Sequence, residues 1–303
     1  MDFQAALREL EPKSPFLVAI DSDGCAFDTM EIKHKECFIP NIIRYWDLQP
    51  VSKFARAAAE FVNLYSEWRG INRFPALTMA FDLLEQWPDV QIRQAAIPEV
   101  ASLREWIRRE TKLGNPTLQL EVERTADPVL RRALEWSEAV NRTIADLVHG
   151  VPPFPSVPAS LERVAGRADI IVCSATPLEA LRREWEEHGI DRFVRVIAGQ
   201  EMGSKKEHLQ MVIRGRYEPD KVLMLGDAPG DLRAAQANGA SFYPINPGHE
   251  EESWSCFLNE GVERFFDGSF DEAYAGGLLA EFQRLLPSKP PWIEERSGAA
   301  DRR

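Results

Sequence analysis

Four short polar clusters in this sequence carry side chains that could do chemistry together. They contain two aspartates (Asp21, Asp23), a serine (Ser174), a lysine pair (Lys205, Lys206) and two more aspartates (Asp227, Asp231). Carboxylates crowded into one place repel each other strongly unless a cation lies among them. Oxygen ligands favour a hard cation, and one or two carboxylates with a substrate phosphate is a common arrangement around Mg²⁺.

This set of groups suits phosphoryl transfer. A carboxylate can attack phosphorus and form an aspartyl-phosphate, which splits one difficult step into two. A metal ion can neutralise charge on the phosphate, and a lysine and a hydroxyl can hold its remaining oxygens. A second carboxylic acid can protonate the leaving oxygen.

Short apolar runs position these clusters. Apolar runs of this length, separated by helical stretches, predict buried parallel strands in a doubly wound α/β sheet. The runs are Phe16–Ile20, Asp169–Cys173, Phe193–Ile197, Lys221–Leu225 and Ala240–Ile245. Ligands of such sheets bind beyond the carboxyl ends of the strands, so the polar clusters that follow the runs should converge there.

Residues 28–150 show helical patterns and no convincing strand. The helices are expected over Glu31–Leu48 with a break near Pro40, Lys53–Trp68, Pro75–Trp87, Pro98–Lys112 and Pro128–Val148, with Ser52 and Asp127 as N-caps. The predicted domains are an α/β catalytic core of residues 1–27 and 151–286, an inserted all-α cap of residues 28–150, and a mostly disordered tail of residues 287–303.

The motifs Asp21-x-Asp23-Gly24, Ser174, Lys205 and Gly226-Asp227-x-x-x-Asp231 resemble the four ordered motifs of the haloacid dehalogenase-like (HAD) hydrolase superfamily. The insertion lies between Asp21 and Ser174, which are 153 residues apart, whereas Ser174 and Lys205 are 31 apart. This placement is similar to that of the helical-cap (C1) branch. Cys25 departs from the family pattern, which usually has Thr or Val there, and we expect it to be tolerated.

The resemblance implies a role for each motif residue. Asp21 would be the nucleophile and Asp23 the general acid and base. Mg²⁺ would be held by the Asp21 carboxylate, the Asp23 backbone carbonyl and Asp227, with Asp231 supporting the metal site. Ser174 and the motif lysine would bind the substrate phosphate. Leu209 and Val212 follow at helical spacing, which favours Lys205 over Lys206 as that lysine.

The function expected from these features is a Mg²⁺-dependent phosphatase that hydrolyses a small phosphorylated metabolite. A phosphonoacetaldehyde-hydrolase-like enzyme, a phosphosugar-mutase-like enzyme and a non-catalytic scaffold are the alternatives. Relatives that cleave carbon–halogen bonds lack an aspartate equivalent to Asp23, and no cap lysine can be identified as a Schiff-base former. The substrate and the cap residues that select it stay open.

Composition excludes several other classes. Lys plus Arg number 36 against 48 Asp plus Glu, so the formal charge of −12 argues against nucleic-acid binding. No apolar run reaches the about 20 residues of a membrane span, and we expect no signal peptide. Together with these features, four cysteines without a C-x-x-C pair indicate a reduced, cytoplasmic protein. We expect a monomer or a homodimer, and the choice between them stays open. The eight tryptophans are expected to pack in cores, and His208 to be exposed.

Overall fold

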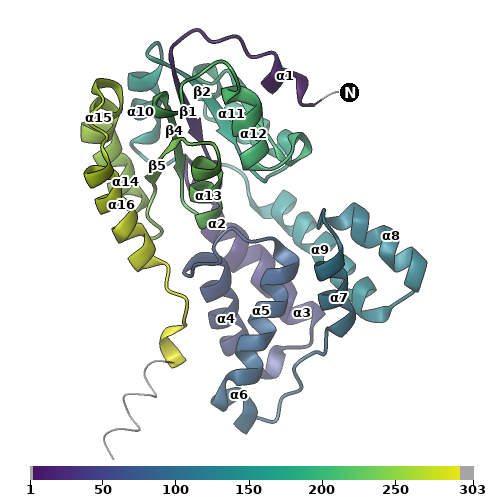
Figure 1. The fold of residues 1–303 in the computed structure, drawn as a ribbon. Helices are drawn as coiled ribbons and strands as arrows, with labels where there is room; N and C mark the ends of the chain where they lie inside the picture. Colours follow the sequence, from purple (N-terminus) through teal and green to yellow (C-terminus); the bar gives the residue numbers. More distant parts are fainter. Residues whose placement is uncertain (1–2, 294–303) are drawn as a thin grey trace, which may run out of the picture. The chain divides into compact units, whose positions relative to one another are not determined.

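The computed structural model describes residues 3–293, which divide into two compact units. The α/β unit consists of residues 3–30 and Gly150–Leu286, and the helical unit consists of Glu31–His149 and residues 287–293. The chain therefore enters the helical unit after the first strand and returns before the second (Figure 1). No helix among the described residues is long and apolar enough to cross a membrane.

The α/β unit is built on a five-stranded parallel sheet with the strand order β3-β2-β1-β4-β5. The strands are β1 Phe16–Ile20, β2 Ala168–Cys173, β3 Val196–Ala198, β4 Val222–Gly226 and β5 Ser241–Pro244. Strand β1 is central, with Ala19 paired to Ile171 of β2 and to Met224 of β4. The expected α/β fold is confirmed. Strand β3 begins later than predicted because Asp191–Phe193 forms a 3₁₀ turn.

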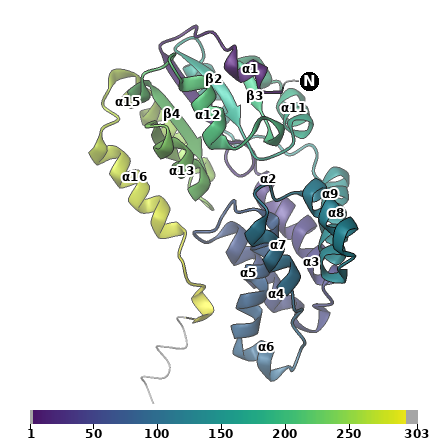
Figure 2. The same cartoon turned by 45° about the vertical axis from the view of Figure 1, so that its right-hand side comes forward.

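Helices cover both faces of this sheet (Figures 1 and 2). They are α1 Ala5–Arg8, α10 Val157–Val164, α11 Leu178–Glu187, α12 Lys205–Ile213, α13 Pro229–Ala237, α14 Glu250–Cys256, α15 Val262–Asp267 and α16 Glu272–Leu285. Since side chains alternate along a strand, Val18 and Ile20 join one apolar cluster while Leu17 and Ala19 join another. Burial on both faces explains why the strands read as continuous apolar runs.

The helical unit contains no strand among its described residues. Its helices are the end of α2 (Thr29–Ile32), α3 Ile39–Tyr45, α4 Ser52–Leu64, α5 Arg73–Gln86, α6 Pro88–Ile92, α7 Ala101–Arg109, α8 Asn115–Thr125 and α9 Pro128–Leu147. The five expected helices are present, and α6 and α8 add to them. Asp127 caps α9 through the N–H groups of Val129 and Leu130, as predicted. Ser52 is instead the first residue of α4 and makes no capping bond.

The helical run around Pro40 does not break as expected. Residues Lys33–Phe38 form a π-helical turn that joins α2 to α3, and Pro40 lies in the first turn of α3. Proline lacks the N–H that an α-helical bond would need, and a wider turn before it lets the chain continue. The sequence therefore located the irregularity but not its kind.

Residues 287–293 differ from the disordered tail that composition suggested. The Trp292 ring stacks on Trp87 with ring centroids 4.2 Å apart and also meets the edge of Phe61. Apolar contact of two indoles outweighs the disorder-promoting prolines around them. The rest of the predicted tail, residues 294–303, lies outside the described residues.

Candidate active site

The predicted site residues lie at or just beyond the carboxyl ends of the strands of the α/β unit. Asp21 directly follows β1, Ser174 follows β2, and Asp227 follows β4. Lys205 begins α12, after β3, and Asp231 lies in the first turn of α13, after β4. Parallel strands end at one edge of the sheet, so the topology brings together residues up to 210 positions apart.

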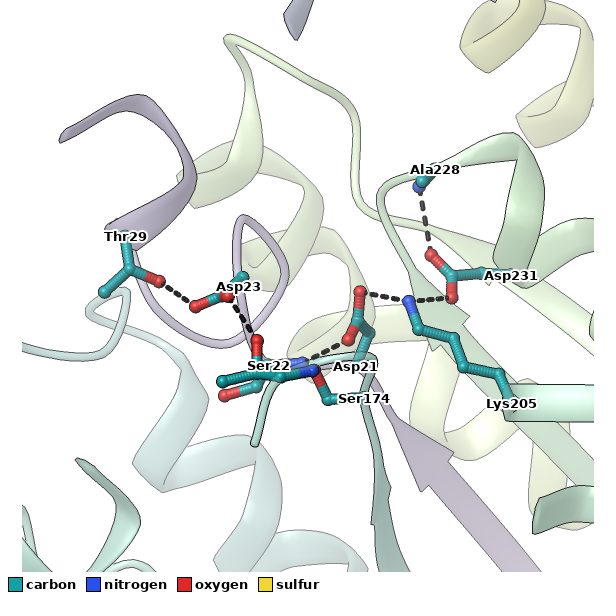
Figure 3. Close-up of polar contacts among 9 residues, drawn as sticks. Asp21, Ser22, Asp23, Thr29, Ser174, Lys205, Ala228 and Asp231 are labelled. Carbon is teal, nitrogen blue, oxygen red and sulfur yellow. Dashed lines mark hydrogen bonds and ion pairs between the residues drawn. The ribbon is translucent and has the colours of Figure 1, made fainter. Parts of the chain in front are cut away.

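Lys205 links two of these carboxylates (Figure 3). Its Nζ donates to Asp21 Oδ2 and to Asp231 Oδ1, each at 2.6 Å. The Ser204–Glu207 capping box fixes the start of α12, which directs the first residue, Lys205, towards the aspartates. Lys206 is exposed. The structure thus places Lys205, the lysine favoured by the sequence, among the aspartates.

Asp231 is held from two sides. Its Oδ1 accepts from Lys205, and its Oδ2 accepts from the backbone N–H of Ala228 at 3.1 Å. The close approach needs glycine at position 226, since a Cβ there would lie 2.3 Å from the Asp231 Cβ. Asp231 therefore caps the start of α13 and also faces the site through Lys205.

Asp21, Asp227 and Asp231 are buried and each can offer one oxygen to the same point. These three oxygens lie within 4.8 Å of one another. Burial raises the pKa of Asp21 to about 6, although Lys205 opposes the rise, and burial likewise raises the pKa of Asp231 to about 6. Burial alone would lower the pKa of Lys205, but Asp21 and Asp231 hold it well above its usual value.

The donor set fits a divalent cation. Three carboxylates and one ammonium group leave a deficit of two positive charges in a buried site. Oxygen donors at this spacing suit a hard cation such as Mg²⁺. Asp21 and Asp231 each accept hydrogen bonds through both carboxylate oxygens, so hydrogen bonding does not rank one above the other as a ligand. A carboxylate oxygen keeps a second lone pair, which either residue could offer to the cation.

Asp23 is separated from this cluster by its own hydrogen bonds (Figure 3). Its Oδ1 accepts from the Thr29 hydroxyl at 2.6 Å, and its Oδ2 accepts from the Thr176 hydroxyl at 2.7 Å. Sequence reasoning did not assign a role to either threonine. Thr176 lies in the polar cluster after β2, which was a usable signal, whereas nothing in the sequence distinguishes Thr29 from an ordinary helix-start residue.

Ser174 lies buried where β2 ends, and its backbone N–H donates to the Ala198 carbonyl at 3.0 Å. Its Oγ accepts from the Thr176 N–H at 3.3 Å. This geometry is a local turn, and the hydroxyl proton is left available for a further acceptor. Ser174 can therefore both shape the loop and donate to an anion.

Comparisons with known proteins return structural similarity only. No family model matches the chain, and no curated protein matches it either. The chain is similar to solved structures of HAD-like hydrolases. The first, a HAD-superfamily hydrolase of subfamily IA from Geobacter sulfurreducens PCA, is 18% identical with a TM-score of 0.40, over 77% of this chain and 88% of that one.

Two further solved structures are also similar to this chain. A haloacid dehalogenase-like hydrolase from Xanthomonas campestris is 13% identical with a TM-score of 0.45, over 88% of this chain and 94% of that one. CbbY from Rhodobacter sphaeroides, solved in complex with phosphate, is 16% identical with a TM-score of 0.40, over 75% and 85% of the two chains.

Proposed function

We propose that this protein is a HAD-like phosphatase that hydrolyses a small phosphorylated metabolite with the help of Mg²⁺. One observation carries the proposal: a buried carboxylate, Asp21, shares a lysine with a second buried carboxylate, while Asp23, two residues on, is held apart by two hydroxyls. A structural protein gains no stability from a cluster of buried carboxylates, because each must be desolvated.

In the first step the Asp21 oxygen attacks phosphorus, and the bond between phosphorus and the ester oxygen breaks. Asp23 gives its proton to the departing alkoxide, which leaves as an alcohol. The phosphoryl group is now bonded to Asp21 as an aspartyl-phosphate. Both Asp23 oxygens accept from threonines, and the oxygen that carries the proton becomes a weaker acceptor.

In the second step a water attacks the phosphorus of the aspartyl-phosphate. Asp23, now ionised, takes a proton from this water, and the bond between phosphorus and Asp21 breaks. Inorganic phosphate leaves and both aspartates return to their starting states. Ser174 and Lys205 hold phosphate oxygens in both steps, as an O–H donor and a charged N–H donor. When bound, Mg²⁺ supplies charge neutralisation between the carboxylates and the phosphate.

The geometry disfavours one alternative reaction, and an assay must separate another. A phosphonoacetaldehyde-hydrolase-like reaction needs a lysine for a Schiff base, and Lys205 is engaged by two carboxylates and carries a raised pKa, which makes its amine a poor nucleophile. A mutase would share the first step and differ in the acceptor of the phosphoryl group, so the assay must distinguish hydrolysis from transfer.

The test is phosphate release across a panel of phosphorylated metabolites, with Mg²⁺ and with a chelator. We expect release for at least one small monoester and its loss on chelation. Transfer of phosphate to a second hydroxyl without release would favour the mutase. No turnover of any panel member or of p-nitrophenyl phosphate would contradict the proposal.

The free cysteines Cys25, Cys37, Cys173 and Cys256 agree with a reducing, cytoplasmic setting.

A further inference from the structure

Two buried tryptophans contact the loop that carries Asp21 and Asp23. The Ser22 side chain contacts α11, whereas the Asp21 side chain contacts Lys205. Ser22 is fully buried. Its Oγ accepts from the Trp185 Nε1 of α11 at 3.0 Å and donates to the Glu184 carboxylate at 3.0 Å. A single hydroxyl thus joins the catalytic loop to α11.

Ser22 also organises the loop through its backbone. Its N–H donates to Asp21 Oδ1 at 2.7 Å. Its carbonyl accepts from the N–H groups of Ala26 at 2.9 Å and Phe27 at 3.0 Å. Any shift of Ser22 would therefore displace the nucleophilic carboxylate and the turn that follows it.

The second tryptophan, Trp254, binds the same loop three residues after Ser22, at Cys25. The Trp254 Nε1 of α14 donates to the backbone carbonyl of Cys25 at 2.6 Å. Both indoles are fully buried, and the Trp185 ring meets the edge of Phe27 with centroids 5.7 Å apart. The loop is accordingly fixed by hydrogen bonds from two helices that are far apart in sequence.

Burial of a tryptophan in this protein does not by itself give its indole N–H a hydrogen-bond partner. Trp46 and Trp136 of the helical unit are equally buried, yet their Nε1 atoms have no hydrogen-bond partner among the described residues. We propose that Trp185 and Trp254 are positioning residues whose N–H groups hold residues 21–27 in the geometry required for attack. This inference rests on the proposed function.

The expected effect follows from the tolerance of catalysis to misplacement. Reacting groups must be held within about 0.5 Å of productive geometry. Removing one N–H leaves a buried acceptor unsatisfied and loosens the loop. Ser174 and Lys205 lie outside the loop, so binding of the phosphate should change less than turnover.

The experiment compares Trp185→Phe and Trp254→Phe with the control Trp136→Phe, which removes an indole N–H that has no partner. Hydrogen exchange of peptides covering residues 16–28 and turnover of p-nitrophenyl phosphate with Mg²⁺ are measured for each. For the first two variants we expect exchange about 5- to 30-fold faster and kcat about 5- to 30-fold lower, the range of one buried hydrogen bond, with KM unchanged. The control should match the wild type in both.

Ser22→Ala separates the hydrogen bond from the packing of the ring. It removes the acceptor and leaves both indoles, so it should reproduce Trp185→Phe, and the double variant should lose little more than either single one. Equal losses in Trp136→Phe, or wild-type exchange and kcat in Ser22→Ala, would overturn the inference. If the wild type has no phosphatase activity, the proposed function is refuted. The inference about the two tryptophans is then still tested, because hydrogen exchange of residues 16–28 shows whether the indoles hold the loop.

Discussion

The α/β unit and the helical unit differ in the polar groups that they bury. The buried carboxylates among the described residues, Asp21, Asp169, Asp227 and Asp231, all lie in the α/β unit. In the helical unit the buried polar groups are mostly amides and hydroxyls, and they bond to nearby backbone. Asn41 and Asn63, for example, donate to the carbonyls four residues before them. Such groups are satisfied locally and leave no charge to be balanced.

The α/β unit itself contains an instructive contrast. Asp169 is as buried as Asp227, but it accepts from the N–H groups of Lys13 and Ser14, from the Tyr217 hydroxyl and from Arg195. These partners fix the chain before β1 against the start of β2. Asp21 and Asp231 instead share one lysine beside Asp227. The charge of Asp169 is therefore compensated by its own partners, whereas three buried carboxylates at the candidate site lie around a single lysine.

The largest effect on activity is expected from substituting Asp21 and Asp23, the two aspartates of the loop that follows β1. Asp23→Asn should lower turnover of alkyl phosphates by about 10²- to 10⁴-fold, because the leaving oxygen then departs without a proton. The loss with p-nitrophenyl phosphate should be smaller, because its leaving group needs less protonation. Asp21→Asn should lose both activities, since no aspartyl-phosphate can form. Steady-state kinetics with both esters decides, and equal losses in Asp23→Asn would refute the acid role.

In the helical unit the largest effect should be on stability. Trp106 is buried and meets the Phe74 ring at a centroid distance of 5.1 Å. Trp106→Ala should lower the free energy of unfolding by about 3–5 kcal/mol, because it leaves a large cavity. Denaturant unfolding measures this, and the exposed Arg108→Ala on the same helix is the control. A large fall in kcat at temperatures where the variant is folded would contradict the division of roles between the units.

The comparison between Asp227 and Asp169 can be tested by metal binding. Asp227→Asn should weaken Mg²⁺ binding by about 100-fold or more, because it removes a charged ligand. Asp169→Asn should destabilise the fold and leave Mg²⁺ affinity unchanged. Isothermal titration calorimetry on both variants gives the two affinities. Unchanged Mg²⁺ affinity in Asp227→Asn would exclude that carboxylate as a ligand.

A smaller effect should come from His208, which is fully buried rather than exposed as its helical context suggested. Burial and the neighbouring Lys205 lower its pKa from 6.5 to about 4. Between these values the unfolded chain binds more protons than the folded one, so stability falls as the pH drops through this window. From pH 7 to pH 5 the loss due to His208 should be about 2 kcal/mol.

His208→Gln removes this titration and keeps those of Asp21 and Asp231, whose pKa values are raised. The difference between the two proteins therefore isolates the histidine. Urea unfolding at pH 7 and pH 5 should show a smaller pH effect in the variant. Parallel pH dependences would show that His208 has the same pKa in the folded and unfolded states, which would contradict the prediction.

Much of the fold and of the site could be predicted from the sequence because it depends on local pattern. Parallel strands that are buried on both faces are apolar throughout. The strand Phe16–Ile20 and the apolar run that ends at Leu225 can therefore be recognised in the sequence. A polar residue directly after such a strand lies at one edge of the sheet, which is why Asp21, Ser174 and Asp227 could be grouped. The N-cap Asp127 followed by Pro128 is equally local.

What only the tertiary structure decided depends on contacts between distant segments. Helix α8 buries mainly Leu118 and Val122 while Leu120 is exposed, so its pattern was too weak to detect. The partners of Ser22 and of the Cys25 carbonyl come from residues that no spacing rule connects to them. Hydrogen bonds of this kind are set by how helices pack on the sheet, and packing is determined by the whole chain at once.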